Sequence, residues 1–334
     1  MPNAAEPDLP AGPSAQGTGR HCDLPQRKVN SLHPQLSVVI PTTRSWSHHE
    51  NLSQEVLGGA ERFGLAVELI IVEDGIDPSN SITPSTSPAA RVVSLFPRTG
   101  RAQARNAGAS VARGSILVFL DADCRPEPSD WMQQILHDFG DDEICAVGGG
   151  VIGGAGTFWT RYQREVNARR ARKHSSLTPG LTSAFLAVRK EVFDQSRGFD
   201  PRYSGYGFED RDLVLRLARR GTLKLEHGIF VTHEDHLLLA DIASKLEEAG
   251  RLTASIFDKD HTESYRALGY AALDCGVHPY LKPVAAVAGP LALAAAPKLD
   301  PWLDRLPYLI SKSTVKLISA AAFLYGTSRR SKVP

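Results

Sequence analysis

Four short, continuous apolar runs in the first third of the chain constrain the fold most strongly. They occupy residues 36–41, 67–75, 91–95 and 116–120. Runs of this length, rich in β-branched residues and bounded by proline, glycine or acids, are typical of strands buried on both faces. Helix-compatible segments lie between them, at about 50–63 and 100–112. The alternation predicts an α/β fold, in which a mostly parallel sheet is flanked by helices.

Composition divides the chain into three predicted parts. Residues 1–34 are rich in proline, glycine and polar side chains, which predicts a disordered N-terminal segment. Residues 35–236 hold the predicted sheet and its helices, with a long loop at 76–90 that lacks periodicity. Residues 237–334 have a largely helical pattern, which predicts a helical C-terminal extension.

Charge and cysteine content narrow the function classes. The 38 basic and 37 acidic side chains nearly balance, which argues against a nucleic-acid partner. The 4 cysteines are far apart and form no CxxC pair, a pattern that disfavours a zinc module and fits a reducing compartment. The N-terminal residues contain no apolar signal-peptide core, so we expect a cytoplasmic protein.

Two apolar stretches near the C-terminus, residues 284–296 and 317–326, leave two interpretations open. Both fit buried helices, and the first is short and broken by a Gly-Pro pair. Both also fit peripheral contact with the inner face of a membrane, because basic residues before and after the second stretch would suit anionic lipid.

Asp121 and Asp123 follow the fourth predicted strand directly. In an extended chain, side chains two residues apart point the same way, so both carboxylates could reach one cation. Ligands of α/β sheets bind at the carboxyl ends of the strands, and Thr42 and Asp74 follow two other strands at the same edge. The pair therefore fits either a Mg²⁺ or Mn²⁺ site that bridges phosphates, or an ordinary turn or helix cap.

Residues 208–221 read as a helix with acids in its first turn. At 100° per residue, Asp210 lies on the apolar stripe and is expected to point inward to a cleft, with Asp212 outward and Glu209 at the side. Favourable interaction with the helix dipole explains Glu209 and Asp212 well. An inward Asp210 needs a partner, which makes it a candidate general base.

Two further features have both a structural and a functional interpretation. His233 and His236 follow a predicted strand and are either structural or metal ligands. Arg101 and Arg105 share one face of a small-residue helix and either contact phosphates or a base, or are simply solvated.

The order of these motifs resembles that of the family 2 glycosyltransferases, which have the GT-A (Rossmann-like) fold. The resemblance rests on SVVIPT, IIVEDG, GRAQARNAG, LVFLDAD and VTH, and extends from residue 36 to 236. The segment GYGFEDRDLVLRL is also similar to the acceptor-side motif of β4-galactosyltransferases and chondroitin-polymerase-type domains. The resemblance implies transfer of a sugar from a nucleotide-sugar, with inversion at the anomeric carbon and with Mn²⁺ or Mg²⁺.

The resemblance also implies roles for individual residues. Asp74 would hydrogen-bond the nucleobase in a pocket that Pro41, Thr42 and Arg105 line. Asp121 would contact the ribose, or the metal through water.

On the metal and acceptor sides, Asp123 and His233 would be the metal ligands. Asp210 would accept the proton of the acceptor hydroxyl, and Glu209 would hold hydroxyls of the acceptor or donor.

Some positions depart from the family pattern. Tyr206 replaces a tryptophan and Phe208 replaces a glycine on the acceptor side, so the acceptor, whether sugar, lipid or peptide, stays open. No QxxRW motif is present, which favours addition of a single sugar, and a UDP-sugar is expected by family habit. A sugar-phosphate nucleotidyltransferase and a non-catalytic nucleotide-sugar-binding protein are the alternatives.

Overall fold

The computed structural model describes residues 33–45, 49–77, 89–153, 157–233 and 237–330. All of them belong to one structural unit, Leu32–Pro334. Nearly all of the predicted disordered segment 1–34 lies outside the described residues, as do residues 78–88 of the predicted loop.

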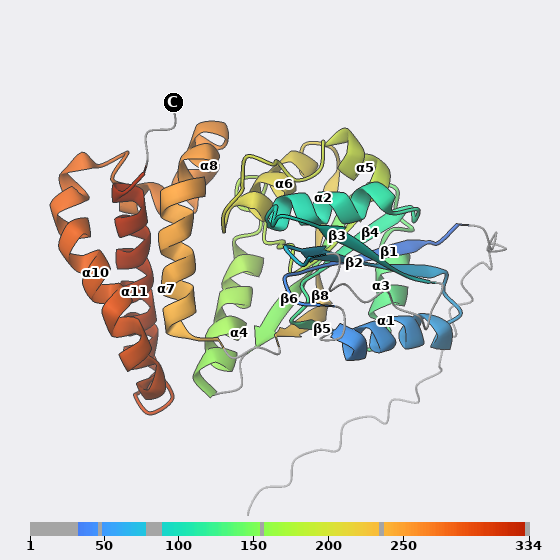
Figure 1. Cartoon of the computed structure of the whole chain (residues 1–334), viewed down its shortest axis with the longest axis horizontal. Helices are drawn as coiled ribbons and strands as arrows, with labels where there is room; N and C mark the ends of the chain where they lie inside the picture. Colours follow the sequence, from blue (N-terminus) through green and yellow to red (C-terminus); the bar gives the residue numbers. More distant parts are fainter. Residues whose placement is uncertain (1–32, 46–48, 78–88, 154–156, 234–236, 331–334) are drawn as a thin grey trace, which may run out of the picture. The chain divides into compact units, whose positions relative to one another are not determined.

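Among the described residues, the strands form one mixed sheet in the order β3-β2-β1-β4-β7-β6-β8-β5 (Figure 1). The strands are β1 (Leu36–Thr42), β2 (Val67–Asp74), β3 (Ala90–Leu95), β4 (Ile116–Leu120), β5 (Cys124–Glu127), β6 (Ile144–Gly153), β7 (Phe185–Arg189) and β8 (Thr222–His233). β3, β2, β1 and β4 pair in parallel, whereas β7 runs antiparallel between β4 and β6. The predicted fold class is confirmed, with the parallel pairing concentrated in the first four strands.

Helices cover both faces of this sheet (Figure 1). One layer contains α1 (Glu50–Arg62) and α3 (Trp131–Asp138), and the other contains α2 (Arg101–Val111), α5 (Lys190–Gln195) and α6 (Glu209–Leu217). Side chains alternate along β1, so Val38 and Ile40 pack in the first layer and Val39 in the second. Gly108 allows α2 to lie against the sheet, because a Cβ there would stand 2.3 Å from Val39 Cγ1.

The remaining helices form the predicted C-terminal extension, which packs on α4 (Thr157–Arg172). They are α7 (Leu239–Glu248), a π-helical turn (Ala249–Thr253), α8 (Ala254–Asp260), α9 (Thr262–Ala267), α10 (Lys282–Leu299) and α11 (Tyr308–Ser328), with short 3₁₀ turns at Tyr270–Leu273, Pro279–Leu281 and Asp300–Trp302. Phe158 and Trp159 of α4 are buried among apolar residues of α7, α10 and α11. The extension therefore shares a hydrophobic core with the sheet domain.

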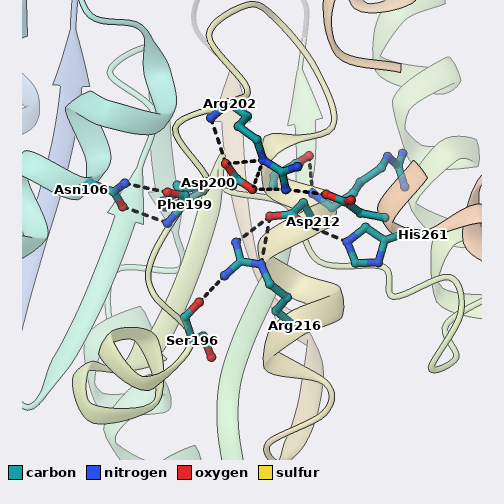
Figure 2. A network of polar contacts seen from close by, with 11 residues as sticks. Asn106, Ser196, Phe199, Asp200, Arg202, Asp212, Arg216 and His261 are labelled. Carbon is teal, nitrogen blue, oxygen red and sulfur yellow. Dashed lines mark hydrogen bonds and ion pairs between the residues drawn. The ribbon is translucent and has the colours of Figure 1, made fainter. Parts of the chain in front are cut away.

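Asp212 of α6 links the sheet domain to this extension (Figure 2). Its Oδ1 lies 2.8 Å from His261 Nε2, and its Oδ2 accepts hydrogen bonds from Arg216 at 2.6 and 3.0 Å. Asp212 is 2% exposed. The prediction that it points outward into solvent is therefore wrong, because the C-terminal helices cover that side of α6.

The outer surface of α10 and α11 is largely apolar. Val287 and Leu291 of α10 and Leu317 of α11 are exposed to 64%, 64% and 70%. By length and composition alone, Pro279–Trp302 is long and apolar enough to cross a membrane, with a mean hydropathy of 1.2 and 22% of its apolar window buried. Burial in the core thus explains why the inner face of α11 is apolar, but it does not explain the apolar side chains over most of α10.

Candidate active site

The carboxyl ends of β1, β2 and β4 open into one cavity of about 260 Å³. The predicted donor-side residues that line it are Pro41, Thr42, Asp74, Arg101, Arg105 and Asp121, together with the predicted metal ligand Asp123. Parallel pairing of the three strands brings these residues to one edge of the sheet.

Asp74 shapes the wall of this cavity. Its Oδ1 accepts hydrogen bonds from the backbone N–H and hydroxyl of Thr99, at 2.6 and 2.9 Å, and its Oδ2 accepts one from the N–H of Gly100 at 2.8 Å. These bonds hold the chain at the start of α2, where Gly100 has a φ of 96°. A carboxylate has about four acceptor positions, so Asp74 keeps capacity for one more donor.

Arg105 is a buried cation between two acids. Its Nη2 donates to Asp121 Oδ1 at 2.7 Å, and its Nη1 lies 3.6 Å from Glu209 Oε1. Arg105 is 1% exposed, and its guanidinium also lies over the ring of Phe199. Within the described part of the chain, Arg105 Nε and Nη1 and Glu209 Oε2 have no hydrogen-bond partner. Buried polar atoms left in this way are suited to a ligand with hydroxyl or phosphate oxygens.

Glu209 and Asp210 open α6 behind a tight turn. Gly207 and Phe208 have φ angles of 94° and 70°, so the chain reverses just before the helix. Glu209 is 4% exposed, whereas Asp210 is half-buried and accepts the N–H of Arg211. Burial, and next the charge of Asp210, raise the pKa of Glu209. The sequence predicted that Asp210 points inward and that Glu209 lies at the side. In the structure Glu209 is the more buried of the two acids, and it lies 3.6 Å from the buried Arg105.

Asp123 and His233 meet because β5 pairs with β8, with Cys124 directly opposite His233. Asp123 Oδ2 lies 3.1 Å from His233 Nε2. Burial acts to raise the pKa of Asp123, but the hydrogen bond and charge of His233 outweigh it and lower this pKa to about 2. Ligand atoms of Asp123, Cys124 and His233 lie within 4.8 Å of one another, which is close enough to hold one metal ion.

The other predicted histidine, His236, lies outside the described residues. Sequence reasoning missed His49, whose Nε2 lies 2.7 Å from the hydroxyl of Thr42 in the same cavity. It also missed Cys124 and the contact between Arg101 and Tyr206, whose ring lies 5.1 Å from the guanidinium. The contacts of Cys124 and Arg101 join segments that are distant along the chain, so no local pattern signals them, whereas His49 lies only seven residues after Thr42.

Comparison with known proteins identifies the domain that carries this site. The family model described as glycosyl transferase family 2 matches residues 37–197. The resemblance predicted from the motifs is thereby confirmed over these residues, which make up just under half of the chain.

The individual relatives of this chain are distant. Mouse polypeptide N-acetylgalactosaminyltransferase 12 is 27% identical over 60% of this chain and 40% of its own length. The N-acetylglucosaminyl-diphospho-decaprenol L-rhamnosyltransferase of Mycobacterium tuberculosis is 30% identical over 46% of this chain and 53% of its own length. The chain thus spans about half, or less, of these curated relatives.

A solved structure supports the fold over most of the chain. The mannosyltransferase PcManGT of Pyrobaculum calidifontis, in complex with GDP-Man and Mn²⁺, has a TM-score of 0.58 and 18% identity. The similarity covers 88% of this chain and 87% of that one, and it therefore includes helices beyond the family match. Glu209, Asp210 and His233 lie after residue 197, so their assignment depends on the geometry of the structure itself.

Proposed function

We propose that this glycosyltransferase transfers one sugar from a nucleotide-sugar, most simply a UDP-sugar, to an acceptor hydroxyl with inversion. The observation that carries the proposal is that seven of the predicted residues line one cavity, in which Arg105 lies 3.6 Å from Glu209 and Asp123 lies 3.1 Å from His233. Within the described residues, Arg105 and Glu209 also keep buried polar atoms without a hydrogen-bond partner. The relatives, which are sugar transferases, and the similar mannosyltransferase structure with GDP-Man and Mn²⁺ support it.

The chemistry of Asp123 and His233 fits a divalent cation. The low pKa of Asp123 keeps its carboxylate ionised at working pH, and a carboxylate with an imidazole suits Mn²⁺ or Mg²⁺. The thiol of Cys124 is a soft donor that such cations do not favour. Asp123 and His233 would hold the cation, which supplies Lewis-acid stabilisation to the leaving diphosphate.

On the donor side, Asp74 keeps an acceptor position for an N–H of the nucleobase, and Thr42 and Pro41 lie in the same cavity. Arg105 fixes Asp121 at 2.7 Å, which orients the other oxygen of Asp121 for a ribose hydroxyl or a metal-bound water. Arg101 is placed to contact the phosphates.

On the acceptor side, Asp210 would accept the proton of the attacking hydroxyl. It is half-buried at the start of α6, next to Glu209, whose Oε2 is free to accept a substrate hydroxyl within the described structure. In-line displacement requires one base, so the two acids have different roles.

The test is nucleoside diphosphate release from a panel of UDP-, GDP-, dTDP- and CDP-sugars with Mn²⁺. Asp210→Asn should keep donor binding and lower the turnover by about 10²–10⁴-fold, the usual contribution of a general base. The exposed Asp142→Asn is the matched control. Unchanged turnover in Asp210→Asn would remove the base assignment. Release of pyrophosphate when a nucleoside triphosphate and a sugar 1-phosphate are supplied in place of the donor would indicate a nucleotidyltransferase instead.

We also propose that the protein is cytoplasmic and contacts an anionic membrane surface through α10 and α11. The described cysteines form no disulfide, which suits a reducing compartment. Val284, Val287 and Leu291 recur on one face of α10 and are 54–64% exposed.

The charges of this segment match an anionic surface. Its basic residues are Lys282, Lys298, Arg305, Lys312, Lys316, Arg329 and Arg330. Its two acids, Asp300 and Asp304, accept the backbone N–H groups of Leu239 and Phe158. The two acids thus stabilise the fold through backbone contacts, and the basic residues outnumber them, as binding to an anionic membrane surface requires.

Vesicle flotation tests this contact. Vesicles with phosphatidylglycerol should carry the protein upward, vesicles of phosphatidylcholine alone should carry less, and Val287→Ser with Leu291→Ser should reduce flotation. The control is Leu177→Ser, because Leu177 is an exposed leucine outside this surface. Equal flotation of the two variants would contradict the proposal.

A further inference from the structure

A second cavity, of about 470 Å³, lies between α4, α7, α11 and the 3₁₀ turn Tyr270–Leu273. Its basic lining residues are Arg169, Arg170, Lys173, Arg211 and Lys316. No acidic residue is among the described residues that line it. A cavity of this volume is within the range of small-molecule sites.

The charged side chains that line this second cavity are all basic. Among the ion pairs of the described residues, none involves these five side chains, whereas the neighbouring Lys312 pairs with Glu165. Burial, and next the like charge of Arg211, lower the pKa of Arg170. The charge of Asp210 acts on both arginines, and a bound anion would further offset their mutual repulsion.

The basic end of the cavity adjoins the proposed base. Arg211 follows Asp210 directly, and its N–H donates to Asp210 Oδ1 at 2.8 Å. The charge of Asp210 also acts on Arg170. A molecule bound by Arg170 and Arg211 therefore lies next to the group that would activate the acceptor hydroxyl.

The other walls of this cavity are apolar. They include Val166 of α4, Ile242 and Leu246 of α7, and Val315 and Phe323 of α11. A site with charged residues at one end and apolar residues along its sides suits an amphiphilic ligand.

We infer that this second cavity binds a phosphate or diphosphate group on the acceptor, beside the hydroxyl that receives the sugar. The inference rests on the proposed function, because it names the chemistry of the acceptor. Guanidinium groups match phosphate oxygens through paired hydrogen bonds, and Lys173 adds charge at the rim. The phosphate belongs either to a soluble phosphosugar or to a lipid carrier.

The experiment is a calorimetric titration of the whole chain, in EDTA, with glucose 1-phosphate as the soluble probe and farnesyl phosphate as the lipid-like probe. EDTA removes the cation on which phosphate binding at Asp123 would depend. The variants are Arg170→Gln and Lys173→Gln. The control is Arg172→Gln, because Arg172 is exposed on the same helix outside the cavity.

We expect at least one probe to bind, and each cavity variant to weaken it about ten-fold, as for loss of one charge-assisted hydrogen bond, while Arg172→Gln leaves it unchanged. Preference for farnesyl phosphate would identify a lipid carrier, and equal affinity a soluble source. No binding of either probe, or equal binding by Lys173→Gln and the control, would overturn the inference. Lys173 is exposed, so its variant gives a result even if Arg170→Gln fails to fold.

Donor binding separates this inference from the proposed function. Nucleoside diphosphate with Mn²⁺ should raise the melting temperature of the wild type and of Lys173→Gln equally. If the wild type shows no such rise in melting temperature, the result counts against the proposed function alone. The phosphate titrations in EDTA do not depend on the donor site.

Discussion

Replacing Asp212 by asparagine tests how the C-terminal extension supports helix α6. The side chain of Asp212 is 3% exposed and contacts His261 at 2.8 Å and Arg216 at 2.6 and 3.0 Å. Asparagine keeps one acceptor oxygen but turns an N–H₂ group toward either the guanidinium or the imidazole. At least one charge-assisted bond is lost and Arg216 loses its counter-ion, which together should cost about 3 kcal/mol.

The assay is equilibrium denaturation by guanidinium chloride at pH 7, followed by circular dichroism. The loss of about 3 kcal/mol refers to the free energy of unfolding. In a thermal melt it corresponds to a melting temperature lower by roughly 6 °C for a domain of this size. Asp142→Asn is the matched control, because the side chain of Asp142 is fully exposed. It should change the free energy of unfolding by less than about 0.5 kcal/mol.

The dependence of this effect on pH has a definite sign. Burial alone would raise the pKa of Asp212, but the bonds from His261 and Arg216 outweigh it and hold that pKa below its ordinary value. A lowered carboxyl pKa stabilises the fold at every pH above about 4, and this contribution is lost as the pH falls through the folded-state pKa. The gap between wild type and Asp212→Asn should therefore be full at pH 7 and narrow below pH 4. A variant as stable as the wild type at pH 7, or a gap that widens in acid, would refute the reasoning.

Two further variants test packing and the site. Gly326→Ala should destabilise the protein by about 1–3 kcal/mol in thermal melts, because the added Cβ would stand 2.0 Å from Glu247 O. Gly58→Ala is the control and should be neutral or stabilising, because no atom lies within 4 Å of its added Cβ. Equal melting temperatures of the two variants would contradict this close packing of α7 on α11. Arg105→Met should lower the free energy of unfolding by about 3 kcal/mol and weaken donor binding, because Glu209 and Asp121 lose their shared cation; donor affinity equal to that of the wild type would exclude Arg105 from the site.

Local patterns were sufficient to predict the first half of the sheet. The apolar run at 67–75 became β2 (Val67–Asp74), and the small-residue segment at 100–112 became α2 (Arg101–Val111). Fully buried parallel strands are continuous apolar runs, so their signal is local. β6 (Ile144–Gly153) was not predicted, because its three consecutive glycines disfavour a strand, and its place depends on pairing with β7 and β8.

The site was predictable where its residues follow strands, as Asp74 and Asp123 do. The contacts that complete it were not, because they join distant segments. Arg105 meets Glu209 only after α2 and α6 pack on the same face of the sheet. Helical phase placed Asp212 in solvent, and only the docked extension, through His261, explains its burial.

The central claim is that this glycosyltransferase holds a nucleotide-sugar through a divalent cation at Asp123 and His233. Calorimetric titration of UDP and GDP with Mn²⁺ tests it most directly, with wild type, Asp123→Asn and the control Asp142→Asn. The account predicts that at least one nucleotide binds wild type and control equally, that Asp123→Asn weakens it about ten-fold or more, and that EDTA abolishes it. Binding of equal strength in EDTA or by Asp123→Asn, or no binding of either nucleotide, would contradict the account.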